Sequence, residues 1–190
     1  MHTLGLLPLI KKFCIYPGTR DNDVGFSQKL FNCRVLRQFS TLTNVQELEI
    51  ECLDIPKFMP RIQRYFRHFF PTVKSLLLKK PRGSRRQIIY FIGLFQHLQN
   101  LKFAYHEDNV QEELVDDPTL VPLFIPPLRG LLRIKHFTAV DLLKDMIDLF
   151  GGFRFRRMLL YNVDGMPLLL DACAKTLETL MLYPSDPRGE

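Results

Sequence analysis

An apolar-x-x-apolar-x-apolar pattern recurs along the chain, and stretches with helical spacing separate its copies. In an extended strand alternate side chains point to opposite faces, so the fourth and sixth positions of each copy share one face. One copy cannot bury that face alone, and neighbouring copies must therefore stack. The copies are Ile10-Phe13-Ile15, Val45-Leu48-Ile50, Val73-Leu76-Leu78, Leu98-Leu101-Phe103, Phe155-Met158-Leu160 and Leu177-Leu180-Leu182, with a shifted copy at Leu132 and Ile134.

The repeat predicts an α/β fold of stacked strand–helix units. A strand followed by a helical crossover joins a parallel neighbour, so we expect a leucine-rich-repeat-like solenoid with strands in chain order and helices on the convex side. Residues 1–190 form a single irregular array in this interpretation. The predicted strands are Leu9–Tyr16, Val45–Glu51, Val73–Lys80, Leu98–Tyr105, Leu128–Phe137, Phe155–Asn162 and Leu177–Tyr183, and the predicted helices are 27–39, 54–70, 84–95, 138–150 and 164–175.

Local signals refine these elements. Ser84 and Gln87 have the spacing of a capping box, and Gly151-Gly152 should end the helix before it. Leu131 and Leu132 cannot both point inward, which predicts a β-bulge in that strand. Among the leucines of the pattern we expect Leu76, Leu101 and Leu160 to be buried.

An acidic, proline-rich insertion interrupts the array at about residues 107–127. Between Glu107 and Pro127 there are six acidic residues and no basic one. A loop of this length is unusual inside a compact array, so it is either mobile or functional. Because opposite charges attract, folding over the concave face beside Lys102, Arg133 and Lys135 is one expectation.

Composition limits the class of partner. The formal net charge is +6, which suits acidic partners, nucleic acid or anionic membrane. A soluble protein with basic turns would have the same net charge. The four cysteines form no C-x-x-C pair, so we expect reduced core thiols in a cytoplasmic or nuclear protein. No apolar run is long enough for a membrane span.

Two copies of the pattern, Leu98–Phe103 (LQNLKF) and Leu177–Leu182 (LETLML), resemble the degenerate leucine-rich region of fungal F-box-type proteins. In that family the F-box binds the adaptor of a cullin ubiquitin ligase, and the repeat region selects the substrate. The resemblance implies substrate recognition for a ubiquitin ligase, without an evident F-box before Ile10. The asparagine of a regular repeat is replaced at its ninth position by Leu53, Pro81, His106, Val163 and Ser185, so the turns must be closed in another way.

The concave face follows from the alternation, since the third, fifth and seventh positions of each copy point away from the core. Tyrosine, arginine and methionine are typical of interface cores, which predicts a protein-binding surface on the later strands. Coverage by another segment, such as the acidic insertion, remains the alternative. The predicted partner-binding residues are Lys102, Arg133, Lys135, Arg157, Leu159, Tyr161, Met181 and Tyr183.

Other charged sets give weaker indications. Glu47, Glu49 and Glu51 share one strand face, and salt bridges to Lys12 and Lys79 are a simpler interpretation than acid–base catalysis. No catalytic, cofactor or metal site is predicted, so we expect a binding protein and not an enzyme. The alternative function is nucleic-acid binding through basic helices, which the sequence makes unlikely because their aromatic residues have core spacing. The basic residues concerned are Arg61, Arg64, Arg67, Arg82, Arg85 and Arg86.

Overall fold

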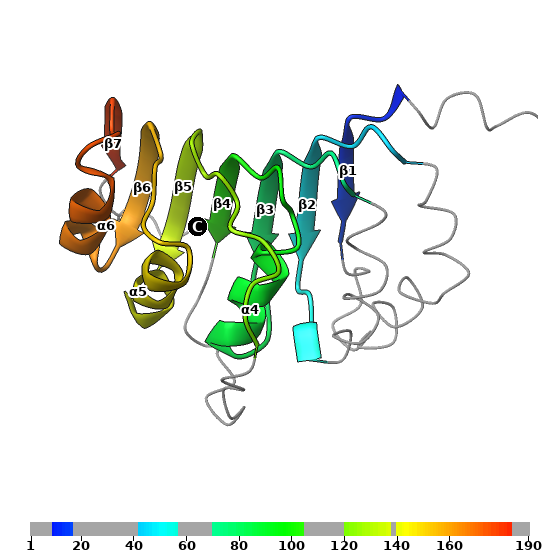
Figure 1. Cartoon of the computed structure of the whole chain (residues 1–190), viewed down its shortest axis with the longest axis horizontal. Helices are drawn as coiled ribbons and strands as arrows, with labels where there is room; N and C mark the ends of the chain where they lie inside the picture. The colour runs from blue at the N-terminus through cyan, green and yellow to red at the C-terminus, as the bar shows by residue number, and fades with distance from the viewer. Residues whose placement is uncertain (1–8, 17–41, 57–69, 105–119, 138–139, 184–190) are drawn as a thin grey trace, which may run out of the picture.

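The strands form one seven-stranded parallel sheet whose order follows the chain, which confirms the predicted topology (Figure 1). The computed structural model describes residues 9–16, 42–56, 70–104, 120–137 and 140–183. Adjacent strands pair without any register offset between the repeated positions, for example Leu48 with Leu76 and Leu76 with Leu101. The strands are β1 (Lys12–Ile15), β2 (Glu47–Glu51), β3 (Ser75–Lys79), β4 (Asn100–Ala104), β5 (Leu131–Phe137), β6 (Arg157–Val163) and β7 (Thr179–Tyr183).

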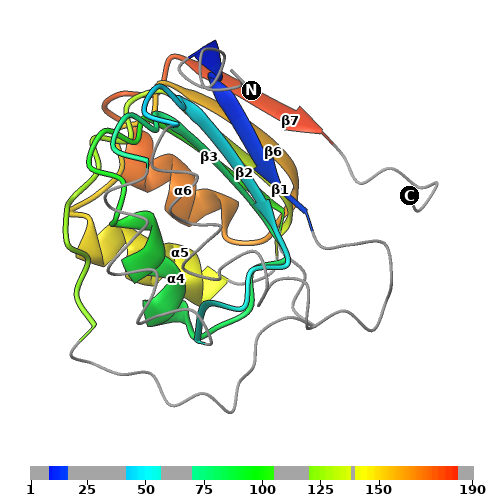
Figure 2. The ribbon, with the colours of Figure 1, turned by 90° about the vertical axis from the view of Figure 1, so that its right-hand side faces the viewer.

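The helices of the described residues all lie on one face of the sheet: α4 (Arg85–Ile92), α5 (Val140–Leu149) and α6 (Met166–Cys173) (Figure 2). The predicted capping box is confirmed, since the Gln87 N–H donates to Ser84 Oγ at 3.3 Å and the Ser84 N–H donates to Gln87 Oε1 at 2.9 Å. Gly151 and Gly152 end α5 with positive φ angles of 69° and 95°. The predicted helix at 27–39, and the one at 54–70 except for its ends, fall outside the described residues.

The core lies between the sheet and the helices, and the repeated apolar positions build it. Leu76, Leu101 and Leu160 are each at most 1% exposed, as predicted. The last strand is different, because Leu180 and Leu182 occupy the same positions of the repeat but are 38% and 51% exposed. The packing of the array is therefore complete from β2 to β6 and open at β7.

A repeated backbone arrangement joins consecutive units just before their strands. At the junction of β1 and β2, the Lys11 carbonyl accepts the N–H groups of Gln46 and Glu47 at 2.8 and 2.9 Å. The residue before one strand thus accepts hydrogen bonds from the start of the next strand and joins two consecutive units. The carbonyls of Gln46, Lys74, Gly130 and Arg156 each accept two N–H groups in the same way.

The junction of β4 and β5 is the exception to this arrangement. There the Asn100 side-chain oxygen accepts the Leu131 N–H at 2.7 Å. The bulge predicted in this strand is wrong, because Leu131 pairs with Arg157 and Leu132 with Met158 in an unbroken register. The extra residue is taken up in the preceding turn, where Leu128 has a φ of +37°.

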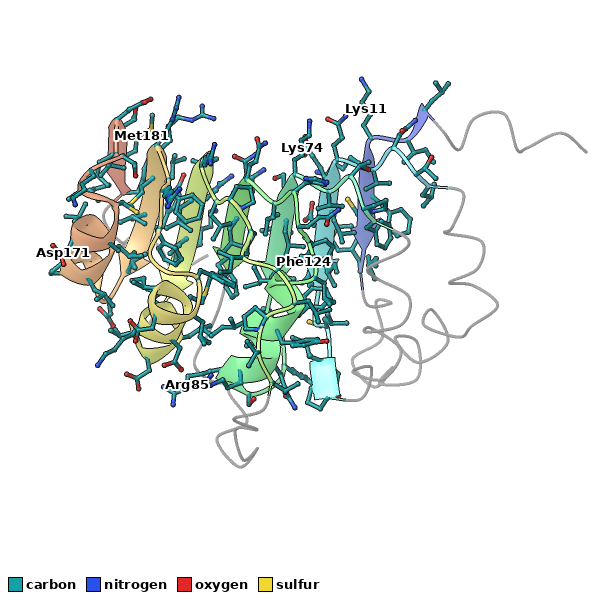
Figure 3. The ribbon with its side chains drawn as sticks, viewed as in Figure 1. Lys11, Lys74, Arg85, Phe124, Asp171 and Met181 are labelled. Atoms are coloured by element: carbon teal, nitrogen blue, oxygen red, sulfur yellow. The ribbon has the colours of Figure 1, made fainter. Side chains whose placement is uncertain are left out.

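The described part of the acidic insertion, residues 120–127, lies on the helix side of the sheet (Figure 3). The Phe124 N–H donates to the Gly93 carbonyl at 3.1 Å, just after the end of α4. Gly93 is required here, since a Cβ atom at this position would collide with Pro122. These residues therefore do not cover the opposite face, and residues 107–119 of the insertion lie outside the described residues.

Candidate functional site

The candidate site is the sheet face opposite the described helices, called the open face below. All of the predicted partner-binding residues belong to strand positions that alternate with the buried ones, and they therefore lie on this face. Strand pairing arranges the side chains in rows that cross the sheet. One row contains Cys14, Glu49, Leu77, Lys102, Arg133, Leu159 and Met181, and the next contains Glu51, Lys79, Ala104, Lys135, Tyr161 and Tyr183.

Glu49 organises the first half of the open face. Its carboxylate lies 3.3 Å from the Lys12 ammonium on β1 and 2.7 Å from the Lys79 ammonium on β3. The Cys14 thiol is 3.7 Å from the same carboxylate. Salt bridges to Lys12 and Lys79 were the predicted role of the glutamates on this strand, and for Glu49 that prediction is confirmed.

The ionisation of Glu49 reflects these partners. Burial is the largest single influence and acts to raise its pKa, because Glu49 is only 6% exposed. Hydrogen bonds from Lys79, Tyr16 and Lys12 together outweigh burial and lower the pKa of Glu49 to about 2. The hydrogen bond to Glu49 in turn raises the pKa of Tyr16. This carboxylate is therefore held charged, which suits a structural ion pair and not a general base working near neutral pH.

The second half of the open face is basic and aromatic. Tyr161 and Tyr183 stack with ring centroids 4.3 Å apart and an interplanar angle of 6°. Arg133 and Lys135 on β5 lie over the Tyr161 ring, 5.5 and 5.0 Å from its centroid. We call Lys102, Arg133, Lys135, Tyr161 and Tyr183 the basic–aromatic patch. Among the described residues, no carboxylate forms a salt bridge with its three cations.

A shallow depression of about 250 Å³ opens beside this patch. Lys79, Lys102, Arg133 and Lys135 line it, together with Leu77, Phe103 and Ala104. Sequence reasoning missed Ala104 as a site residue. The available signal was its small side chain at a position where the neighbouring strands carry Lys79 and Lys135.

The remaining predicted interface residues surround the stacked tyrosines. Arg157 is exposed at the start of β6, and Leu159 is half-buried in the row between Arg133 and Met181. Met181 is 44% exposed at the end of the sheet farthest from Lys11 (Figure 3). Leu159 and Met181 thus form an apolar strip beside the basic–aromatic patch, and tyrosine, arginine and methionine are residue types enriched at protein interfaces.

The basic helix residues have a different environment. Arg85 lies 3.2 Å from Asp141 and 3.5 Å from Asp145, so it connects α4 to α5. These neighbouring carboxylates would oppose a phosphate group. Arg82 is exposed and Arg86 half-buried, while Arg61, Arg64 and Arg67 lie outside the described residues. The described surface around Arg85 is therefore not purely basic, because two carboxylates lie beside the arginine.

Cysteine and histidine chemistry adds little in the described part of the chain. Cys173 is buried, as expected of a core thiol, and burial raises its pKa to about 11. Cys14 and Cys52 are only half-buried, which corrects the expectation that the cysteines are core residues. Within the described ranges no group of three His, Cys, Asp or Glu side chains is placed to hold a metal ion, and no helix is long and apolar enough to cross a membrane.

Comparison of the chain with protein-family models, with curated proteins and with solved structures found no match.

Proposed function

We propose that this chain is a leucine-rich-repeat-like interaction module that binds a protein partner through the open face. The basic–aromatic patch is the observation that carries the proposal. Its stacked tyrosines supply a large rigid contact area, and its three cations have no salt-bridge partner among the described residues.

The repeat character of the module is part of the proposal. Equivalent apolar positions align across neighbouring strands, and successive turns share a carbonyl that accepts two N–H groups. Both features support a solenoid, in which each unit contacts mainly its neighbours. Such an array presents a continuous sheet face, and recognition by that face needs no chemistry by the module itself.

The resemblance to fungal F-box-type proteins suggests a biological setting for this binding. In that setting the partner is a substrate presented to a ubiquitin ligase in the cytoplasm or nucleus. Nucleic-acid binding through the basic helices is the weaker candidate, because Arg85 is already paired with Asp141 and Asp145.

Comparative affinity capture tests the proposal. Tagged wild-type chain, a Tyr161→Ala/Arg157→Ala variant and an Arg85→Ala/Arg86→Ala variant are used to recover proteins from a nuclease-treated fungal lysate. We expect a set of proteins that the wild type and the helix variant both recover and that the open-face variant recovers at least about fivefold less, since interface anchors are worth about 1 kcal/mol or more each.

Two results contradict the proposal. One is equal recovery by the open-face variant and the wild type. The other is loss of all partners on nuclease treatment together with loss of binding by the helix variant, which would assign the function to phosphate contacts on α4. Thermal unfolding of each variant shows that any loss of recovery is not a loss of folding.

A further inference from the structure

The depression beside the basic–aromatic patch is strongly basic, because four of its seven lining residues are cations and Ala104 lies next to them. Strand pairing places Ala104 between Lys79 on β3 and Lys135 on β5. Lys102 precedes Ala104 by two residues on the same face of β4, and Arg133 pairs with Lys102 across to β5. We call Lys79, Lys102, Arg133 and Lys135 the cationic ring. A small side chain at its centre leaves the depression of about 250 Å³.

The charge of the cationic ring is only partly balanced within the described residues. Lys79 is 2.7 Å from the Glu49 carboxylate, whereas Lys102, Arg133 and Lys135 form no salt bridge there. Like charges directly opposite each other on neighbouring strands are destabilising. A negatively charged ligand over Ala104 would remove this repulsion.

The volume of the depression and the spacing of its cations indicate which kind of anion could bind there. Typical pockets for whole small molecules measure about 300–1,000 Å³, so this depression suits a side chain and not a nucleotide or cofactor. Its cations are distributed over three strands about 4.8 Å apart and over positions about 7 Å apart along a strand. Several carboxylates spaced along an extended chain match this distribution better than one compact anion.

We propose that the cationic ring is a subsite for a run of acidic residues on the protein partner, with one carboxylate seated over Ala104. This inference rests on the proposed function and names the chemistry of the partner. Lys102, Arg133 and Lys135 supply the charge, and Ala104 supplies the space.

Fluorescence anisotropy with a labelled hexaglutamate peptide tests the subsite, and a labelled hexaglutamine peptide is the matched control. We expect the hexaglutamate peptide to bind at low salt, to weaken as salt rises, and to bind more tightly than hexaglutamine. Lys102→Gln removes one cation and Ala104→Leu fills the depression without a charge change; each should weaken binding by about threefold to tenfold. Lys144→Gln, which removes the charge of an exposed lysine on α5, is the control variant. It should change the affinity for hexaglutamate by less than about a factor of 1.5 at a salt concentration that screens the net charge of the protein.

Equal binding of hexaglutamate to wild type, Lys102→Gln and Ala104→Leu would overturn the inference, as would equal loss in Lys144→Gln. Preferential binding of inorganic phosphate or of labelled oligo(dT), without competition by the hexaglutamate peptide, would assign the cationic ring to phosphate instead. Failure here is separable from failure of the proposed function, because affinity capture depends on Tyr161 and Arg157. If Tyr161→Ala/Arg157→Ala abolishes the capture of partners and Lys102→Gln does not affect it, the proposed function is supported and only the acidic subsite is contradicted.

Discussion

The two halves of the open face carry similar residues but use them differently. On β1–β3, Glu49 lies between Lys12 and Lys79 and forms an ion pair with each. On β4–β6, Lys102, Arg133 and Lys135 have no salt bridge among the described residues and two of them lie over Tyr161. The first half is an ion-pair cluster, whereas the three cations of the second half have no carboxylate partner among the described residues.

The difference comes from which residues the register places side by side. Both halves obey the same alternation of buried and outward positions. A carboxylate between two lysines forms a structural ion-pair cluster. Lysine opposite arginine, and lysine opposite tyrosine, include no carboxylate, so their positive charge is not balanced by the strands themselves. Charge on a strand therefore indicates binding only after its cross-strand neighbours are known.

The largest expected effect concerns the register on which this comparison depends. Leu101→Ala should lower the free energy of unfolding by about 2–5 kcal/mol, because Leu101 is 1% exposed. Leu182→Ala, at the sixth position of the last copy of the repeat, should cost less than about 1 kcal/mol, because Leu182 is 51% exposed. Urea unfolding measures both, and equal costs for the two variants would show that the array is not open at β7.

A smaller effect is expected from breaking the ion-pair cluster of the first half. The pKa of Glu49 is lowered to about 2 in the folded state, so its charged form stabilises the fold at pH values above the ordinary pKa of a carboxyl group. This stabilisation is lost as the pH falls from about 5 towards 2. Glu49→Gln should therefore be less stable than wild type at pH 7, by up to about 3 kcal/mol, and the two should converge near pH 2. Urea midpoints across this pH range check it; a constant difference would mean that Glu49 does not act through its charge.

The smallest expected effect compares one tyrosine from each half. Tyr161→Ala should weaken the captured partner by about 1 kcal/mol or more, because Tyr161 belongs to the stacked pair of the basic–aromatic patch. Tyr16→Ala, at the Glu49 cluster, should change affinity by less than about 0.5 kcal/mol. Isothermal titration calorimetry with the purified partner gives both values, and a larger loss for Tyr16→Ala would reverse the assignment of the two halves.

Much of this architecture was predictable because it follows from local patterns. Alternating apolar positions gave seven strands in chain order, and the Ser84–Gln87 spacing gave a helix start. The salt bridges of Glu49 were also predictable, since Lys12 and Lys79 lie on the same face of the two adjacent strands, level with Glu47 and Glu51.

Features that depend on register or turn geometry could not be predicted in the same way. The bulge at Leu131 was expected because the extra residue was counted as part of the strand, whereas the positive φ of Leu128 places it in the turn. The depression over Ala104 requires three strands in exact alignment, and Asn100 replaces a backbone acceptor at only one junction. None of these arrangements has a periodic signal in the chain.

The most direct test of the central claim is a methyl NMR footprint of the captured partner on the chain. Leu77, Leu159 and Met181 report on the open face. Val121, Leu123 and Ile125 report on the exposed surface of residues 120–127, which lie beside the end of α4 on the helix side. We predict that addition of the partner shifts or broadens the methyl signals of Leu77, Leu159 and Met181 and leaves the other three unchanged. Perturbation confined to Val121, Leu123 and Ile125 would contradict the account, because it would place the partner on the helix side of the sheet.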